Sequence, residues 1–347
     1  MAKDEKKIKE PVKGFRKFLK GFLKTIGIVL LILVLAAGVL LVIPAFERSA
    51  ADPDLYIMDW MRGLPDEKKL SEIRIPGVHD AATENVELAF VTRCQEHSIK
   101  KLLTDGFRYL DIRLAIEKKA NGEGTDQKLR FVHGPMKCKT GFWPWAANLY
   151  LDDVLKDCYE FLENHPDETI IFAVKQESGD ESVEEFQSVL NHYVSENKER
   201  WLLRNGEIPT LDEARGKLVL MRRYEDKAGL GADAGIPLFW ADQGNKDHTE
   251  LNYAYEQSGD FTLAVQDRYN YGEEDKWAAF TAKPDRKTDL TISFLSTAGS
   301  FVVGHPFGSA KALNKRFAAL DPKELPEGWI ILDFGNVLLA KQIIDAN

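Results

Sequence analysis

Short β-like runs separated by helical patterns recur along most of this 347-residue chain and point to an α/β fold. Apolar residues have helical spacing in Asp152–Asn164 and in Ser182–Val194, whereas residues 141–150 and 225–237 show neither period and are expected to be loops. Eight strands that alternate with helices predict a parallel, irregular (β/α)8 TIM-type barrel. The eight expected strands are Arg74–His79, Tyr109–Ala115, Leu129–His133, Thr169–Gln176, Lys217–Arg223, Thr262–Gln266, Thr291–Ser296 and Trp329–Phe334.

A long uncharged segment precedes this pattern. Residues 25–46 contain no charged side chain, and a helix of that length reaches ~33 Å, enough to cross a hydrocarbon core of ~30 Å. Residues 1–24 carry nine Lys and Arg against three Asp and Glu, and such basic flanks stay in the cytoplasm. We therefore expect a single-pass protein of the cell membrane. Its parts would be a basic cytoplasmic segment (1–24), a transmembrane helix (25–46), a linker (47–54) and an extracellular barrel (55–347).

A cleaved signal peptide is the alternative for the same segment. Ser49-Ala50-Ala51 offers small residues that suit a cleavage site. The apolar part of a signal peptide usually has about 7–15 residues. The longer run found here favours an uncleaved anchor.

Charge and cysteine content argue against two classes of function. Beyond residue 24 the chain has 37 basic and 52 acidic residues, whereas a nucleic-acid-binding body needs a basic face. The three cysteines, Cys94, Cys138 and Cys158, lack a metal-binding spacing such as C-x-x-C and leave any disulfide pairing open.

Histidines, acids and an arginine stand at the ends of successive β-like runs. His79 and His133 each end such a run, and Asp111 and Arg113 are two residues apart, so their side chains share one face of a strand. In barrels of this type the active site lies at the carboxyl ends of the strands. Two imidazoles and a guanidinium at that end suit acid–base chemistry on a phosphate ester. The carboxylates available to orient the imidazoles are Asp80, Asp111 and Asp333.

Each of these residues also has a purely structural interpretation. A lone histidine is more often structural than catalytic, and Arg113 fits a salt bridge with Asp111 or Glu117. Lys175 and Glu177 on an otherwise apolar strand fit a buried ion pair as well as a substrate contact. The case for a catalytic site therefore rests on the combination.

A metal site is the main chemical alternative, because hard cations gather several carboxylates. In Asp111-Ile112-Arg113 an arginine stands where a second carboxylate would serve. A guanidinium supplies the positive charge that a cation would otherwise bring. The sequence therefore favours a mechanism with no metal and no cofactor.

An aromatic segment, Phe142-Trp143-Pro144-Trp145, follows His133 closely. Core packing is the usual role of aromatic residues. The proline and the lack of a period equally support a rim loop that contacts lipid or covers the site.

Eight short motifs occur in an order that matches a known family. They are Ile75–Asp80, Asp111–Arg113, His133–Pro135 and residues 165–171, 215–217, 222–224, 265–269 and 328–333. The chain from about Trp60 to its C-terminus resembles the bacterial-type phosphatidylinositol-specific phospholipase C family, the X-domain superfamily. The resemblance implies an irregular (β/α)8 barrel and a metal-independent lyase reaction. In that reaction the inositol 2-hydroxyl attacks phosphorus and releases diacylglycerol and a cyclic inositol phosphate.

The resemblance further implies roles for individual residues. His79 would be the general base, oriented by Asp333. His133 would be the general acid, paired with Asp80.

Charge stabilisation and substrate binding are implied in the same way. Arg113, supported by Asp111, would stabilise the phosphoryl oxygens. The positions that would hold the inositol ring, with the tyrosine stacked on it, are Lys175, Arg223, Asp267 and Tyr269.

Two features depart from the family pattern. The family usually has Thr and Ser around the first His-Asp pair, where this chain has Val78 and Ala81, but those hydroxyls are not expected to carry protons. Family members are mostly secreted without an anchor, so the apolar N-terminal helix is an addition that would hold the enzyme beside its lipid substrate. The expected partners are a phosphatidylinositol-type lipid and the membrane.

Two other functions remain open from the sequence. A metal-dependent glycerophosphodiester phosphodiesterase also uses a barrel and has a histidine near a pair such as Glu84-Asn85, although Arg113 argues against it. A non-catalytic barrel that binds inositol lipids is the other alternative.

Overall fold

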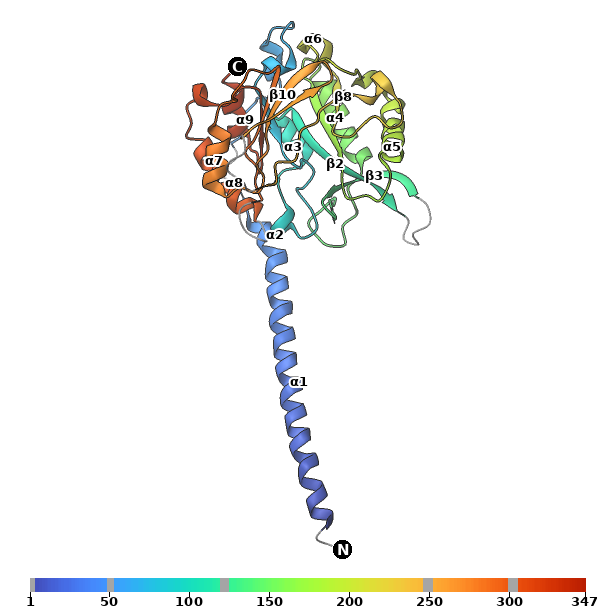
Figure 1. Cartoon of the computed structure of the whole chain (residues 1–347), viewed down its shortest axis with the longest axis vertical. Coiled ribbons are helices and arrows are strands. Elements are labelled where there is room, and N and C mark those ends of the chain that lie inside the picture. The colour runs from blue at the N-terminus through green and yellow to red at the C-terminus, as the bar shows by residue number, and fades with distance from the viewer. Residues whose placement is uncertain (1–3, 49–52, 119–124, 246–251, 299–304) are drawn as a thin grey trace. The chain divides into compact units, whose positions relative to one another are not determined.

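The computed structural model describes residues 4–48, 53–118, 125–245, 252–298 and 305–347 (Figure 1). The chain separates into an N-terminal unit that ends at Phe46 and a body that runs from Glu47 to Asn347. The N-terminal unit contains one long helix, α1 (Asp4–Val42), followed by a 3-10 turn, η1 (Ile43–Phe46). The basic lead-in and the apolar run therefore form one continuous helix.

The stretch Gly14–Phe46 is long and apolar enough to cross a membrane, with a mean hydropathy of 3.4 in its 18-residue window. A signal sequence near an N-terminus has the same properties, so this finding is compatible with either an anchor or a signal. The expected linker, residues 47–54, stays a prediction, because residues 49–52 lie outside the described part of the chain. Glu47 is a buried residue of the body, 6% exposed.

Parallel strands form most of the sheet in the body. β2 (Tyr109–Lys118) and β12 (Trp329–Leu332) flank β1 (Ile75–Val78), and parallel pairing continues on both sides. The order is β8, β7, β5, β2, β1, β12, β11, β10, where the further strands are β5 (Ile170–Gln176), β7 (Leu218–Arg222), β8 (Ile236–Pro237), β10 (Phe261–Gln266) and β11 (Leu290–Phe294). The predicted irregular TIM-type barrel is therefore confirmed.

The sector between β8 and β10 is the most irregular part of the barrel. β9 (Ala254–Ser258) runs antiparallel to β10. The Ser258 hydroxyl donates to the carbonyl of Pro237 in β8 at 2.8 Å. A side-chain hydrogen bond thus bridges this sector.

One strand prediction and one loop prediction need correction. The expected barrel strand Leu129–His133 is part of β3 (Thr125–His133), which runs antiparallel to β2 and pairs with the short β4 (Met136–Lys137). The eighth parallel strand is instead β8, in a stretch expected to be loop. Alternation of side chains shows which residues share a face, but it carries no information on strand direction or partner.

Alternate residues of the parallel strands face the barrel interior. In β5, Ile171 and Ala173 belong to the core inside the barrel. Phe172, between them, points outward and belongs to the core between the sheet and the helices α4 and α5. Tyr109 and Trp329 are fully buried inside the barrel, with ring centroids 5.6 Å apart. This inward series leads along each strand to its carboxyl end.

Helices cover the outside of the sheet. α4 (Leu151–Asn164) and α5 (Val183–Glu196) confirm the two predicted helices, and the Ser182 hydroxyl accepts a backbone N–H at the start of α5. A short 3-10 turn, η2 (Trp60–Gly63), precedes the first barrel strand. The other elements are α2 (Ala89–Thr92), α3 (Ile99–Thr104), α6 (Leu211–Ala214), α7 (Glu273–Thr281), α8 (Pro306–Phe317), α9 (Val337–Ile344), β6 (Trp201–Leu202), η3 (Leu70–Glu72), η4 (Lys198–Arg200), η5 (Gly231–Ala234) and η6 (Pro322–Glu324).

Candidate active site

Seven of the ten predicted site residues continue the inward-facing series of a barrel strand, and the parallel strands therefore carry them to one end of the sheet. Tyr109 faces inward in β2, and Asp111 and Arg113 follow two and four residues later. Ile171 leads in the same way to Lys175. The remaining series end at His79 after Ile75, Arg223 after Val219 and Met221, Asp267 after Leu263 and Val265, and Asp333 after Trp329 and Ile331.

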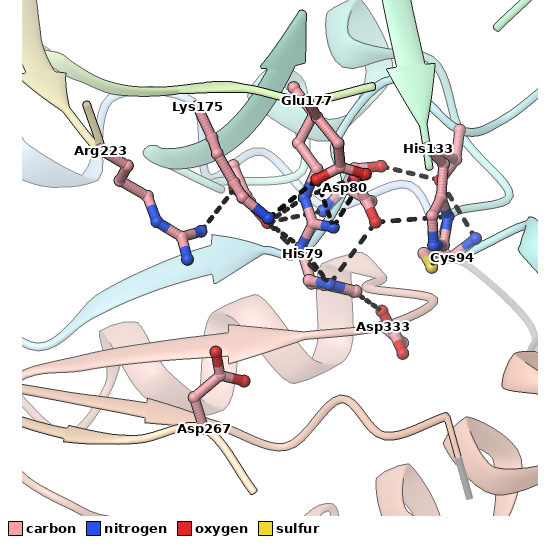
Figure 2. Close-up of polar contacts among 12 residues, drawn as sticks. His79, Asp80, Cys94, His133, Lys175, Glu177, Arg223, Asp267 and Asp333 are labelled. Carbon is pink, nitrogen blue, oxygen red and sulfur yellow. Dashed lines mark hydrogen bonds and ion pairs between the residues drawn. The ribbon is translucent and has the colours of Figure 1, made fainter. Parts of the chain in front are cut away.

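His79 lies beside Asp333, as Figure 2 shows, and its other ring nitrogen faces the guanidinium of Arg113. Its Nδ1 lies 2.8 Å from Oδ1 of Asp333, and its Nε2 lies 2.8 Å from Nη2 of Arg113. Because a guanidinium only donates, Nε2 accepts and Nδ1 donates to Asp333. Burial lowers the pKa of His79, but the carboxylates of Asp333 and Asp80 outweigh it and raise the pKa from 6.5 to about 9. The acids therefore make this imidazole a stronger base, and proton uptake at Nε2 requires Arg113 to move away.

His133 reaches the same place from the antiparallel β3. Its Nδ1 lies 2.7 Å from the Thr92 carbonyl oxygen and 3.3 Å from Oδ2 of Asp80. The pairing with Asp80 is thus present, but His133 shares it with a closer backbone acceptor. The ring centroids of His79 and His133 are 6.4 Å apart, and the rings are nearly perpendicular (Figure 2). At this separation both rings can reach a single phosphodiester group.

Arg113 is the centre of the polar network beside the histidines. Its Nε lies 2.9 Å from Asp80, its Nη2 lies 3.1 Å from Asp111 and its Nη1 lies 3.1 Å from Glu177. Burial opposes ionisation of both Asp111 and Arg113. Their mutual attraction outweighs it, so the pKa of Asp111 is lowered and the pKa of Arg113 is raised well above its ordinary value. Arg113 therefore stays positively charged and Asp111 stays negatively charged in the site.

Asp80 occupies a strained position. Its φ of +44° lies in the left-handed region, which is uncommon for a residue other than glycine. The carboxylate is 2% exposed and makes ion-pair contacts with Arg113, His133 and His79, but it accepts no well-aligned hydrogen bond from the described residues. Burial raises the pKa of Asp80. Strained backbone that surrounding contacts enforce is typical of functional sites.

The opposite wall of the site combines aromatic rings with polar groups. The Arg223 guanidinium lies over the Trp240 ring, 3.8 Å from its centroid, and Trp240 Nε1 donates to Asp267 at 3.3 Å. The Tyr269 hydroxyl donates to Asp242 at 2.8 Å. Together the two walls enclose a cleft of about 660 Å³, a volume typical of small-molecule sites.

All ten predicted site residues come together here. Asp80 and Asp111 are buried against Arg113. The eight that line the cleft are His79, Arg113, His133, Lys175, Arg223, Asp267, Tyr269 and Asp333.

Glu177 belongs to the site although the sequence analysis did not select it as a site residue. It accepts from Lys175 Nζ at 2.9 Å and from the Gly134 N–H at 2.5 Å, in addition to Arg113. Burial opposes its ionisation, but Arg113 and Lys175 lower the pKa of Glu177 to about 2. The sequence did contain a signal for Glu177: it lies two residues after Lys175 on an otherwise apolar strand, so both side chains are on the same face.

Three further residues of the cleft were missed. The Cys94 Sγ lies 3.8 Å from His133 Nδ1, and this thiol, like those of Cys138 and Cys158, is buried and free. Trp240 and Asp242 lie in a stretch with no secondary-structure period, so no sequence signal marked them.

One group of potential metal ligands occurs among the described residues. His79, Asp80 and Cys94 place one ligand atom each within 4.8 Å of the others. Arg113 already contacts two of them, since its nitrogens lie 2.8 Å from His79 Nε2 and 2.9 Å from Asp80 Oδ1. A cation bound there would have to displace this guanidinium, so the donor set fits a metal poorly.

Fold and site together define a class of protein: a TIM-type barrel enzyme with two imidazoles, a guanidinium and buried carboxylates at its mouth. The family model for phosphatidylinositol-specific phospholipase C, X domain, matches residues 79–224. A 1-phosphatidylinositol phosphodiesterase of Staphylococcus aureus is 27% identical over 316 residues, which cover 83% of this chain and 94% of that protein. One of Listeria monocytogenes is 30% identical over 183 residues, which cover 49% of this chain and 50% of that protein.

Solved structures agree on the fold. A mutant phosphatidylinositol-specific phospholipase C from S. aureus superimposes with a TM-score of 0.66 and 23% identity, over 84% of this chain and 98% of that one. The L. monocytogenes enzyme gives a TM-score of 0.58 and 24% identity, over 84% and 99% of the two chains. Residues 79–224 of this chain therefore match the X domain of phosphatidylinositol-specific phospholipase C, and most of the chain is similar to bacterial 1-phosphatidylinositol phosphodiesterases.

Proposed function

We propose that this protein cleaves phosphatidylinositol, or a glycosylated derivative, into diacylglycerol and an inositol cyclic phosphate by a metal-independent lyase reaction. The observation that carries the proposal is the pair of imidazoles, 6.4 Å apart, with the Arg113 guanidinium in contact with one of them in the same cleft. The names of the relatives, 1-phosphatidylinositol phosphodiesterases, support the substrate.

His79 acts as the general base. Its Nε2 removes the proton of the inositol 2-hydroxyl while that oxygen forms a bond to phosphorus. The hydroxyl is adjacent to the phosphate in the substrate, so correct positioning replaces a separate nucleophile. Arg113 leaves Nε2 for the phosphoryl oxygens when the substrate binds, which frees the lone pair and stabilises the negative charge. Asp333, 2.8 Å from Nδ1, then stabilises the imidazolium.

His133 acts as the general acid. The Thr92 carbonyl and Asp80 both face Nδ1, so the proton given to the leaving group is the one on Nε2. That proton passes to the glycerol oxygen as its bond to phosphorus breaks. One phosphorus–oxygen bond forms and one breaks, and the two histidines exchange protonation states.

The other wall of the cleft binds the inositol ring. Lys175, Arg223 and Asp267 all line the cleft. Lys175 and Arg223 donate hydrogen bonds to the ring hydroxyls, and Asp267 accepts hydrogen bonds from ring hydroxyls. Tyr269 packs its ring against the apolar face of the sugar, with its hydroxyl held by Asp242.

The N-terminal helix anchors the enzyme to the cell membrane in this proposal. Residues 25–46 span the bilayer once, residues 1–24 stay in the cytoplasm, and the barrel acts outside the cell. Tethering raises the effective concentration of lipid substrate at the barrel. Retention of Met1–Phe46 in the mature protein, seen by mass spectrometry of isolated membranes, tests this against a cleaved signal peptide.

Phosphorus NMR of phosphatidylinositol incubated with the full chain and a chelator tests the reaction. We expect the cyclic phosphate to form, and we expect His79→Ala and His133→Ala each to lower its rate by at least about 10²-fold. His192→Ala is the matched control, because this histidine is exposed on α5, outside the cleft. Full activity of either cleft variant would reject the assignment.

The chelator separates the metal-free mechanism from its main alternative. Loss of turnover with chelator, restored by a divalent cation, would indicate a metal-dependent phosphodiesterase. Binding of inositol phosphate with no turnover would indicate a non-catalytic barrel.

A further inference from the structure

Glu47 is an unusual residue for the start of the body. It directly follows the apolar run that ends at Phe46, yet its side chain is buried rather than exposed. Its Oε1 lies 2.6 Å from His305 Nε2, and its Oε2 lies 3.4 Å from Arg93 Nη2. The same Arg93 nitrogen donates to the Glu47 carbonyl oxygen at 3.0 Å. We call Glu47, Arg93 and His305 the junction clamp.

The junction clamp connects two helices that each contribute a residue to the lining of the cleft. Arg93 directly follows α2, and His305 directly precedes α8. The His305 ring also stacks on Phe90 of α2, with centroids 4.4 Å apart. α2 and α8 lie side by side in the body (Figure 1). Val91 of α2 and Pro306 of α8 both line the cleft.

The segment that Glu47 holds supports both histidines. The Thr92 carbonyl accepts from His133 Nδ1 at 2.7 Å, and Gln95 Nε2 donates to the His79 carbonyl oxygen at 2.7 Å. The Cys94 carbonyl accepts from the N–H of Phe334, the residue after Asp333, at 2.7 Å. Residues 92–95 therefore form hydrogen bonds with Nδ1 of His133, with the backbone of His79 and with the backbone next to Asp333. One short stretch of backbone thus holds both histidines.

From these contacts we infer that Glu47 is a positioning residue, which fixes residues 92–95 through Arg93 and α8 through His305 and so sets the orientation of His133. The inference rests on the proposed function of the cleft. Glu47, Arg93 and His305 are not among the described residues that line the cleft, so Glu47 acts through residues 92–95 and through α8. Removing the charge of Glu47 takes the ion-pair partner away from the largely buried Arg93 guanidinium. The backbone that carries Thr92 then shifts. A small displacement of a proton donor is enough to slow the chemical step while substrate binding on the opposite wall is retained.

The test compares full-chain variants in detergent micelles with a monomeric short-chain phosphatidylinositol. We expect Glu47→Gln to lower kcat about tenfold while KM changes less than about twofold. Glu47→Asp keeps the charge and should recover part of the loss. In proton–nitrogen NMR spectra, the His133 Nδ1–H signal should shift or broaden in Glu47→Gln, because its acceptor on Thr92 has moved.

Asp59→Asn is the matched control. Asp59 Oδ1 lies 2.8 Å from His165 Nδ1, so it also forms a half-buried acid–histidine pair, and neither residue lines the cleft. We expect this variant to keep the wild-type kcat even where it lowers the melting temperature. An equal loss of kcat in both variants would show that general destabilisation, rather than positioning, is responsible.

The remaining outcomes are also decisive. A wild-type kcat in Glu47→Gln, with an unchanged His133 signal, rejects the inference. If Glu47→Gln does not fold, His305→Gln takes its place with the same expected kcat and NMR changes. An inactive wild-type protein would overturn the proposed function, and the NMR comparison would then decide alone whether Glu47 positions His133.

Discussion

Asp333→Asn tests whether a carboxylate sets the basicity of His79. The asparagine keeps the size of the side chain and an oxygen that can accept from Nδ1, but it removes a negative charge 2.8 Å away. Asp333 is only 3% exposed, so the solvent screens this interaction weakly. The substitution therefore changes the charge with little change in packing.

The size of the effect follows from the pKa of His79. Against the opposing effect of burial, Asp333 and Asp80 raise that pKa from 6.5 to about 9. The net shift, with burial and Arg113 opposing the two acids, favours the protonated ring by roughly 3 kcal/mol, since one pKa unit corresponds to ~1.4 kcal/mol. Asp333 is the stronger of the two, so its neutralisation should lower the pKa of His79 by roughly one to two pH units.

The sign of the pH dependence follows from the proposed role. A general base works when it is unprotonated, so kcat/KM should rise with pH as His79 loses its proton. The rising limb is expected near pH 9 in the wild type and at lower pH in Asp333→Asn. The plateau should fall about 10²-fold, because a weaker base with a less stabilised imidazolium remains.

The assay is kcat/KM between pH 5 and 10 with monomeric substrate and chelator, supported by an NMR titration of His79. Asp233→Asn, an exposed acid on η5, is the control and should leave the limb in place. A limb at the same pH in wild type and Asp333→Asn would refute the reasoning. Stability provides a second measurement. The free energy of unfolding of the wild-type protein should decrease as the pH rises from 6.5 through about 9, and that of Asp333→Asn should decrease less.

Two further predictions concern charge and lipid contact. Arg113→Lys keeps one positive charge but loses the planar fork that contacts Asp80 and the neighbouring acids, so kcat should fall about 10²–10³-fold in the same assay. A loss of less than tenfold would speak against the phosphate-clamp role. Trp143 and Trp145 are exposed and stacked, with centroids 5.1 Å apart. Replacing both by Ala should lower turnover of phosphatidylinositol in vesicles about tenfold and leave the monomeric substrate unaffected, because buried indole area favours the bilayer interface. Equal rates of the wild type and the double variant on vesicles would contradict a lipid contact by these two tryptophans.

Most of the site was predictable from short-range features of the chain. The carboxyl ends of parallel strands meet at one end of a barrel, and period-two alternation turns Asp111 and Arg113 toward the same side as Tyr109. These two rules are enough to bring His79, Lys175 and the other strand-end residues together. The family motifs then distinguish such a mouth from a surface salt-bridge cluster.

Other features needed the full structure. The pattern of Leu129–His133 is that of a strand, but only pairing shows that β3 is antiparallel and lies beside β2. β8 has two residues, too few for any period to be visible. Trp240 and Asp242 reach the cleft from irregular backbone that no local rule describes.

The sequence by itself determined that the chain has a long apolar N-terminal helix and a barrel whose strand ends carry acids, bases and an arginine, because hydrophobic length and alternation are local properties. Only the tertiary structure decided how charges far apart in the chain neutralise one another. His79 meets Asp333, and Glu47 meets His305, across more than two hundred residues. Such pairs depend on strand order and loop paths, which long-range packing selects.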